Sequence, residues 1–450
     1  MKAMLKQQPF QQVVVVFFVL IATIVFTESL RAQTTTIAPE QSGVTFTKDV
    51  APILQQHCQE CHRPNGIAPM SLLSYEDARP FAKAMKLKVA SRAMPPWFID
   101  PNVGITAFKN FGGLSDDDIA TIVKWADAGA PRGNPADMPP PLSFEEDSAK
   151  WRIGTPDVVA SMPQDFLVKA SVPDMWWNTT LDPGLKEDRY LKAVEVRPTK
   201  GSRVIHHMGT SLVYPEGGSA TIQSKFANVF EDGSGRLMKA GTKVNLGLHL
   251  HAYREDTAVN VQIGLVFYPK GYVPKYVVIT ELLGDDHSLD LPPNTDNIRY
   301  DSYKMLNKPT RIIGYAPHMH TRAKAQCLEA ILPEKSEQRD GNKVEILSCI
   351  NNFDFNWMLE YEYATDAQPL LPAGTVLHLI SWYNNTGSNR LNNDPDNWIG
   401  YGQRSIDDMA MAWMTFFSLS EEDFQQQVAE RKAKSKSKEI TQNLSGRVTH

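Results

Sequence analysis

Hydrophobic and polar residues alternate along several short stretches in the second half of the chain. The clearest stretch is 259–267, where Val259, Val261, Ile263, Leu265 and Phe267 are separated mainly by polar or small residues. A period of two residues predicts a strand with one buried face. Similar runs, bounded by Gly, Pro, Asn and Asp, occur at 203–214, 244–251, 311–316, 344–350 and 374–383. This pattern is typical of β-sandwiches rather than of alternating α/β units.

About 270 residues of this pattern are more than one sandwich needs, so we expect two all-β jelly-roll-like sandwich domains, at 153–285 and 286–420. A helical period precedes them. Val50, Ile53 and Leu54 lie at helical spacing, and the capping-box pattern that begins at Ser115 leads into a second amphipathic helix. We therefore expect a small all-α domain over 45–135, a Pro-rich linker over 136–152 and a polar tail over 421–450.

The first residues have the pattern of an export signal. Lys2 and Lys6 precede an apolar run at 13–26, which is too short for a spanning helix. We predict a signal peptide over 1–33 and export to the periplasm or the medium; an uncleaved N-terminal anchor remains the alternative. No later stretch contains 18 consecutive apolar residues, so no membrane span is expected once the signal is removed.

Composition excludes several other classes of protein. With 42% hydrophobic and 22% charged residues the chain of 450 residues is an ordinary globular protein rather than a disordered one. A formal net charge of -5 gives no electrostatic basis for binding nucleic acid. Four cysteines are too few for a disulfide-dense scaffold.

Two of these cysteines form the motif Cys58-Gln-Glu-Cys61-His62, the c-type haem attachment pattern. Thiols three positions apart can both form thioethers to one porphyrin edge while the adjoining imidazole ligates the iron. A structural zinc site would need further ligands, and only His57 is close. A thioredoxin-like redox pair would need a βαβ context, which is absent. We predict one covalent haem c.

The sixth iron ligand is expected to be a methionine, because no other histidine occurs between 63 and 205. Met94 is favoured because two prolines follow it and stiffen the backbone that presents its sulfur. Met70, eight residues after His62, remains the alternative. With its two terminal helices, the haem motif and Met94, this stretch of about 90 residues resembles class I cytochrome c domains, which implies the same fold here.

Six of the 11 histidines occur as three pairs in the β-rich region. His318 and His320, like His249 and His251, are two positions apart and share one face of a strand. One member of the second pair is a candidate outer-shell partner. His206 and the adjacent His207 can bind one metal only where the strand bends or ends. Together the pairs predict metal binding.

Ligand chemistry favours copper over zinc. Imidazole suits both metals, whereas a thioether selects copper. Asp407, Asp408, Met409 and Met411 place thioethers beside carboxylates. A site of two histidines and one methionine would stabilise Cu(I) and tolerate Cu(II), as a redox cofactor requires.

These motifs resemble, in order, those of the copper type II, ascorbate-dependent monooxygenases, a family that includes peptidylglycine alpha-hydroxylating and dopamine beta-monooxygenases. The resemblance covers about 155–418. It implies two jelly-roll-like sandwiches, each with one copper ion. The implied ligands are His206, His207 and His249 for one copper and His318, His320 and Met409 for the other.

The resemblance implies a monooxygenase that uses O₂ to hydroxylate a C–H bond of a small organic substrate, with the copper at His318, His320 and Met409 activating O₂. Ala316 stands where the peptide-processing member has a substrate-binding arginine, so peptide amidation is not expected. We expect the haem, reduced by an external electron donor, to supply the electrons. The alternatives are a non-catalytic copper and haem electron-transfer protein and a haem protein with a ligand-binding or adhesion module.

The other two cysteines, Cys327 and Cys349, flank an expected hairpin around 333–342. In an oxidising compartment we predict that they form a disulfide. The alternative is a pair of buried thiols. The cysteine that follows the ligand methionine in the family is Ala410 here, so that disulfide of the family is missing.

Overall fold

The structure is a computed structural model, and it describes residues 43–445 except 65, 110, 145–149, 173–174, 224–226, 285–286 and 335–342. The side chains of 207, 219–223 and 437–445 are also outside the description. The predicted signal peptide and the tip of the 333–342 hairpin therefore lie outside the described residues. No helix within the described ranges is both long and apolar enough to cross a membrane.

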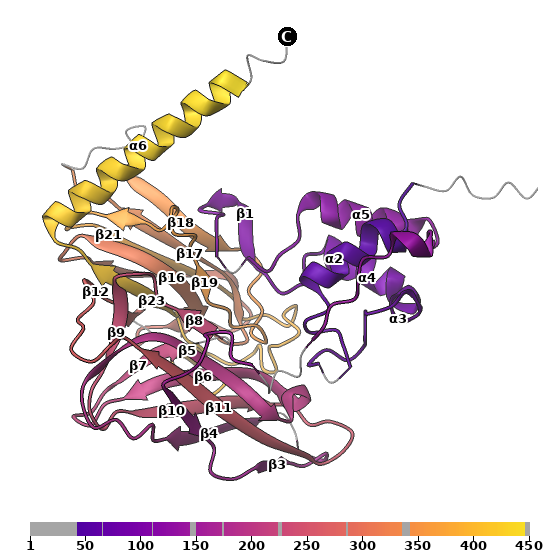
Figure 1. Cartoon of the computed structure of the whole chain (residues 1–450), viewed down its shortest axis with the longest axis horizontal. Helices are drawn as coiled ribbons and strands as arrows, with labels where there is room; N and C mark the ends of the chain where they lie inside the picture. Colours follow the sequence, from indigo (N-terminus) through magenta and orange to yellow (C-terminus); the bar gives the residue numbers. More distant parts are fainter. Residues whose placement is uncertain are drawn as a thin grey trace, which may run out of the picture.

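Helices are short and occur mainly before residue 138, apart from the last element (Figure 1). They are η1 Phe46–Val50, α2 Ala51–His57, α3 Tyr75–Ala78, η2 Arg79–Phe81, α4 Ala82–Ala90, α5 Asp116–Asp127, η3 Pro135–Asp137, η4 Ser202–Val204 and α6 Glu421–Ser445. We call 43–97 and 112–138 the helical segment. Ser115 and Asp118 form the expected capping box at the start of α5, which fixes where that helix begins. The helices pack around Phe46, Leu54, Ile122 and Trp125.

The first sandwich consists of a four-stranded sheet, β4-β10-β6-β7, and a larger sheet, β12-β9-β5-β11-β2, to which β3 and β8 are added. The strands are β2 Val158–Ser161, β3 Phe166–Val168, β4 Met175–Leu181, β5 Arg189–Lys200, β6 Ile205–Val213, β7 Ser219–Gln223, β8 Ala227–Val229, β9 Ser234–Met238, β10 Lys243–Leu250, β11 Thr257–Phe267 and β12 Tyr276–Val277.

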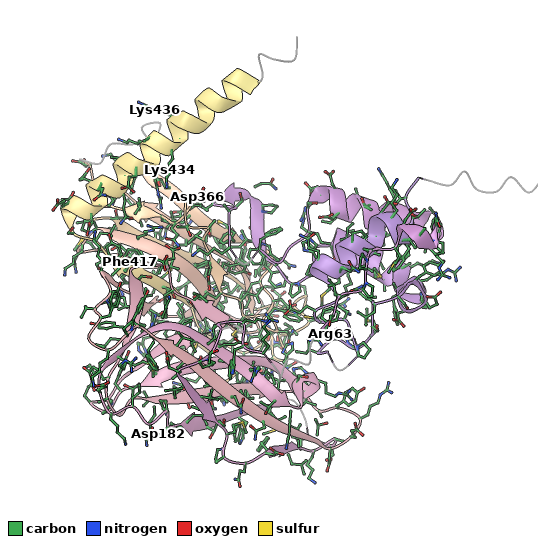
Figure 2. The ribbon with its side chains drawn as sticks, viewed as in Figure 1. Arg63, Asp182, Asp366, Phe417, Lys434 and Lys436 are labelled. Carbon is green, nitrogen blue, oxygen red and sulfur yellow. A yellow bond between two sulfur atoms is a disulfide. The ribbon has the colours of Figure 1, made fainter. Side chains whose placement is uncertain are left out.

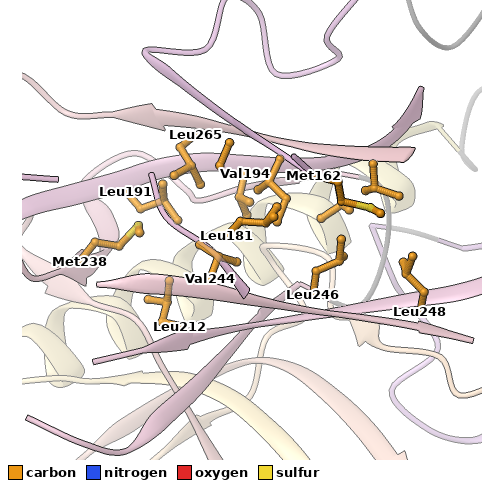
Figure 3. Packing of buried hydrophobic residues seen from close by; sticks show 14 of the residues in the cluster. Met162, Leu181, Leu191, Val194, Leu212, Met238, Val244, Leu246, Leu248 and Leu265 are labelled. Atoms are coloured by element: carbon orange, nitrogen blue, oxygen red, sulfur yellow. The ribbon is translucent and has the colours of Figure 1, made fainter. Parts of the chain in front are cut away.

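The alternation of buried and less buried residues along the strands explains the core of this sandwich. Every second residue of β10, from Val244 to Leu250, is fully buried, as is every second residue of β11 from Val259 to Leu265. The two sets face each other between the sheets, where Leu181, Leu212 and Met238 fill the remaining space (Figure 3). This core holds β6 and β10 in place, and both strands carry histidines.

The second sandwich pairs the sheet β1-β18-β17-β21-β15 with the sheet β13-β23-β16-β19, to which β20 is added; β14 and β22 form a small separate ladder. The strands are β1 Ile99–Gly104, β13 Ile279–Leu283, β14 Asp290–Leu291, β15 Asp296–Met305, β16 Thr310–His318, β17 Ala323–Ile331, β18 Val344–Ile350, β19 Tyr361–Glu362, β20 Leu370–Leu371, β21 Val376–Asn384, β22 Ile399–Gly400 and β23 Met411–Ser418.

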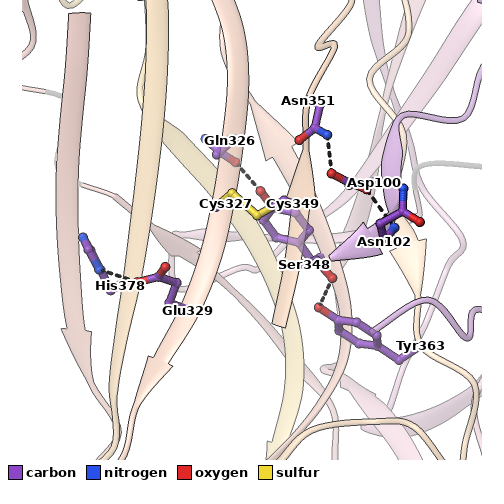
Figure 4. The surroundings of a disulfide bond; sticks show 11 residues. Asp100, Asn102, Gln326, Cys327, Glu329, Ser348, Cys349, Asn351, Tyr363 and His378 are labelled. Carbon is purple, nitrogen blue, oxygen red and sulfur yellow. Dashed lines mark hydrogen bonds and ion pairs between the residues drawn. A yellow bond between two sulfur atoms is a disulfide. The ribbon is translucent and has the colours of Figure 1, made fainter. Parts of the chain in front are cut away.

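The predicted Cys327–Cys349 disulfide is present and joins directly opposed positions of β17 and β18 (Figure 4). On the next strand of the same sheet, His378 lies between two carboxylates. Its Nδ1 is 3.1 Å from an oxygen of Glu329, and its Nε2 is 2.7 Å from an oxygen of Asp301. Both ring nitrogens of this histidine are therefore engaged with carboxylates.

The predicted fold class, which placed an all-α cytochrome c domain over 45–135, is wrong. The described chain is mostly β-sheet, and β1 lies inside that range, antiparallel to β18 of the second sandwich. Trp97 and Phe108 are buried against Tyr361 in the core of that sandwich. The reason is physical: burying large aromatic rings between two sheets removes much apolar area from water.

Further contacts tie the helical segment and the two sandwiches together. Arg152, just before β2, forms an ion pair with Glu60 at 2.6 Å. Arg63 lies on the side of the helical segment that faces the sheets, with its guanidinium 4.8 Å from the ring centre of Phe144 (Figure 2). Glu231 of the first sandwich accepts hydrogen bonds from Lys109 and from residues of the second sandwich. The relative position of the parts is thus fixed by specific polar contacts.

Replacing Trp97 by alanine tests the placement of β1 in the second sandwich. Trp97 is 8% exposed, and its ring contacts Phe108, Phe111 and Tyr361. We expect Trp97→Ala to lower the free energy of unfolding by roughly 3–5 kcal/mol, as aromatic truncation in a core does. Urea denaturation measures this change. The control Phe111→Ala removes a half-exposed ring and is expected to cost about 1 kcal/mol or less; equal effects of the two substitutions would contradict the placement.

Candidate metal centres

Three imidazoles come together at one end of the four-stranded sheet. His206 lies on β6, His249 on β10, and His251 directly after β10. One ligand atom from each histidine lies within 4.8 Å of one atom of each of the others. His249 is buried and the other two are half-buried. We call this group the triad. Its spacing and donor set fit one metal ion, and imidazole suits copper and zinc.

A break in the strand register places His206 in the triad. Along β6 and β10, His249 pairs with His207, but the next residue, Leu250, pairs with Ile205. His206 is therefore the extra residue of a bulge, a feature that redirects a side chain. The bulge follows η4, which begins after Gly201 in the left-handed region with φ of 70°. A side chain at Gly201 would also press on the carbonyl oxygen of Ala258, so glycine is required at this turn.

Two tryptophans flank the triad. Trp176 of β4 stacks on His249 with ring centres 4.6 Å apart and planes 6° from parallel. Trp357 belongs to the loop between β18 and β19 of the second sandwich, yet its ring lies edge-on to His206 at 5.1 Å. The triad is thus built by the first sandwich and touched by the second. Neither contact was predicted from the sequence.

The sequence prediction named His206, His207 and His249 as ligands, with His251 as a candidate outer-shell residue. The structure brings His206 and His249 together, with the two Nδ1 atoms 3.3 Å apart, and adds His251 to them. The side chain of His207 lies outside the described residues; its backbone pairs with His249. The shared face of positions 249 and 251 was the sequence signal for His251.

The second predicted site begins at the end of β16. His318 is its last residue, and His320 follows two positions later, with ring centres 5.5 Å apart. Burial, with a smaller effect of the neighbouring His320, lowers the pKa of His318 to about 4. The imidazole of His318 is therefore neutral at pH 7, the form in which histidine binds a metal.

A fully buried carboxylate, Asp408, organises the backbone around this pair. Its oxygens accept hydrogen bonds from the backbone N–H groups of His320, Arg322 and Met409 at 2.9–3.1 Å. Burial raises the pKa of Asp408, while these hydrogen bonds favour its charged form. The contacts bring the backbone of Met409 beside that of His320. The Met409 carbonyl also accepts a hydrogen bond from the Tyr383 hydroxyl at 2.7 Å, and Met409 is buried.

The imidazole of His320 is oriented by a backbone contact. The Nδ1 of His320 is 3.2 Å from the carbonyl oxygen of Asp407, which leaves Nε2 as the ligand atom. A metal-binding histidine commonly donates its other N–H in this way, and the contact fixes the ring. His318 and His320 therefore fit a copper ion by donor type, and Asp408 holds the backbone of Met409 close to that of His320.

The haem motif lies where α2 ends. The backbone N–H groups of Cys61 and His62 both donate to the carbonyl of Cys58, so a tight turn holds the motif. Burial, helped by the neighbouring Cys61, raises the pKa of the Cys58 thiol to about 12, whereas Cys61 is exposed. The Nδ1 of His62 lies 3.2 Å from the carbonyl oxygen of Met70, which leaves Nε2 to face an iron. The three residues fit a covalently attached haem.

The two candidate methionine ligands occupy different environments. Met70 presents its carbonyl to His62, so its backbone lies on the His62 side, and its side chain packs on the helical core. Met94 lines an apolar cavity between α4, β1 and α5, together with Val89, Trp97 and Leu114. No described contact joins Met94 to His62. Met94 stays the predicted sixth ligand and Met70 the alternative.

Comparisons with known proteins add no functional information. No protein-family model and no curated protein matches the chain. Among solved structures, the major capsid protein P2 from bacteriophage PM2 is similar over 58% of this chain and 96% of its own, with 9% identity and a TM-score of 0.26. A likeness of that size supports no conclusion about function.

Removing His249 tests the triad. We expect the wild-type protein to retain one copper ion more per chain than His249→Ala, because a ligand is lost from a cluster of three. Metal analysis after Cu(II) loading and gel filtration measures the difference. The matched control is His287→Ala, which removes an exposed histidine that is not part of the triad and is expected to keep the wild-type copper content. Equal copper in all three proteins would show that the triad does not bind the metal.

The lowered pKa of His318 predicts a pH effect on the stability of the metal-free protein. Between pH 6.5 and about 4 the unfolded chain takes up a proton that folded His318 does not, so the free energy of unfolding decreases as the pH falls. We expect His318→Gln to remove on the order of 2 kcal/mol of this decrease. Urea denaturation at pH 7 and pH 4.5 measures it, with His287→Gln as the control. Identical pH profiles for His318→Gln and wild type would refute the prediction.

Proposed function

We propose that the chain is an exported, haem-linked copper monooxygenase, similar to the copper type II, ascorbate-dependent family, that hydroxylates a C–H bond of a small organic substrate. The triad of His206, His249 and His251 is the observation that carries this proposal. Its three imidazole donors lie within 4.8 Å of one another, a spacing at which all three can bind one metal ion.

We assign a different role to each of the two candidate copper sites on the basis of its ligands. The triad, with His207 as the further ligand that the family resemblance implies, would hold the copper that passes an electron. His318, His320 and Met409 would hold the copper that meets O₂, since a thioether stabilises Cu(I). When bound, the two copper ions supply two electrons to O₂, which is enough for one oxygen atom to leave as water and the other to enter the substrate.

The protein side chains provide fixed geometry for this chemistry. The bulge at His206 directs its ring toward the triad, and Trp176 limits rotation of the His249 ring by stacking on it. At the second site the N–H groups bound by Asp408 hold the backbone on either side of the ligands. Preorganised ligands of this kind need little rearrangement when a copper ion changes its oxidation state.

The haem is proposed as the electron entry point. Cys58, Cys61 and His62 would hold it on the helical segment, with Met94 as the proposed sixth ligand. The ion pair between Glu60 and Arg152 connects this motif to the chain just before β2 of the first sandwich, because Glu60 lies inside the motif itself. An external donor in the periplasm or the medium would reduce the haem.

The proposal is tested by metal analysis of the mature protein combined with Met409→Ala. We expect one haem and two coppers per chain in the wild type, a loss of affinity for one copper of on the order of tenfold or more in the variant, and O₂-dependent reoxidation of the reduced haem that requires Met409. The control Met305→Ala removes an exposed methionine and leaves all three readouts unchanged.

Two results would contradict the proposal. Haem without stoichiometric copper would indicate a haem protein with a binding module. Two coppers with haem reoxidation that does not depend on Met409 would indicate an electron-transfer or copper-holding protein.

A further inference from the structure

One loop of the second sandwich reaches both candidate copper sites. It comprises residues 351–360, between β18 and β19. The ring of Phe355 lies edge-on to His320 with centres 5.8 Å apart, and the ring of Trp357 lies edge-on to His206 with centres 5.1 Å apart. The two aromatic residues are separated by Asn356 alone. Three consecutive residues therefore connect a ligand of one site with a ligand of the other.

The loop is held in this position by its own contacts. The carboxylate of Asp354 accepts two hydrogen bonds from Asn356, at 2.9 and 3.0 Å, and the N–H of Trp357 donates to the carbonyl of Asp354. The N–H of Phe353 donates to the carbonyl of Lys324 on β17. Phe353 and Trp357 also pack against the core of the second sandwich. These contacts hold the backbone of the loop and the ring of Trp357 in place.

We propose that Phe355, Asn356 and Trp357 form the path along which an electron moves between the two copper sites. The inference rests on the proposed function and specifies how the sites communicate. The step is a one-electron exchange: Cu(I) at the triad is oxidised to Cu(II), Cu(II) at the His318 and His320 site is reduced to Cu(I), and no bond or proton changes place.

Electronic coupling decays less steeply through bonded and packed atoms than through solvent, so a covalent segment with ring contacts at both ends favours this route. The ring contacts are short enough for direct van der Waals packing. Trp176 provides the comparison, because it stacks on His249 but comes from β4 of the same sandwich as the triad. Trp176 therefore contacts the triad but is not part of the segment 355–357, which reaches the site of His318 and His320.

The experiment follows each copper separately. Full-length protein loaded with two Cu(II) ions is mixed without air with one equivalent of ascorbate and frozen at intervals for EPR spectroscopy. Variants that lack one site, His249→Ala and His318→Ala, identify the two signals. We compare the wild type with Trp357→Leu, Trp357→Phe and Trp176→Leu, after confirming equal copper content and unchanged signals of the oxidised protein.

In the wild type the two Cu(II) signals are expected to decay together. In Trp357→Leu the site that ascorbate reduces first keeps its rate, while the second lags by on the order of tenfold. Trp357→Phe retains an aromatic ring and most of the wild-type rate, and Trp176→Leu shows no lag. These results support the path. A general loss of structure would instead alter the EPR signals of the oxidised protein, and it would delay reduction in the Trp357 and Trp176 variants alike.

Other results overturn the inference. Decay in Trp357→Leu that matches the wild type, or the same lag in Trp176→Leu, would exclude a specific path through the loop. Failure of the proposed function looks different, because the wild type would then bind fewer than two coppers and show no second signal. In that case the loop has no sites to connect.

Discussion

The shift in register between β6 and β10 is the feature on which the proposed chemistry depends most. In an unbroken ladder His206 and His207 would point to opposite faces. The shift makes His206 an extra residue and places its ring beside His249 and His251. The short helix η4 precedes the bulge along the chain, and the partner strand β10 is held in place by its buried alternate residues. The sandwich core therefore fixes the triad, although none of the three imidazoles belongs to that core.

The second site is organised by a different constraint. There the histidines lie where β16 ends, so the pairing of that strand does not hold the backbone beyond His318. Hydrogen bonds to a buried carboxylate hold it instead. Asp408 binds N–H groups of the histidine turn and of the residue after itself, so two segments 88 positions apart are held together. A buried charge is costly unless it is fully hydrogen-bonded. Its presence beside His320 and Met409 is consistent with a site that must keep its geometry.

Local patterns in the sequence predicted local structure well. The alternation at 259–267, the capping box at Ser115 and the cysteine pair at Cys327 and Cys349 depend on near neighbours or on one hairpin, and each appears as expected. The pairing of β1 with β18 could not be predicted in this way. It joins segments about 250 residues apart, and the stretch from Ile99 to Gly104 contains a proline and no clear alternation. A helical domain was therefore extended over residues that belong to a sheet.

The same distinction applies to the sites. The paired histidines indicated where metal ligands lie, but the role of His251 and the contact of Trp357 with His206 depend on how a bulge and a distant loop pack. The central claim is that the chain holds copper at two separate histidine sites. The most direct measurement is an anomalous difference map, recorded at the copper edge, from crystals of copper-loaded protein. The account predicts one peak among His206, His249 and His251 and another at His318 and His320 beside the sulfur of Met409. Copper at neither position, or only at surface carboxylates, would contradict it.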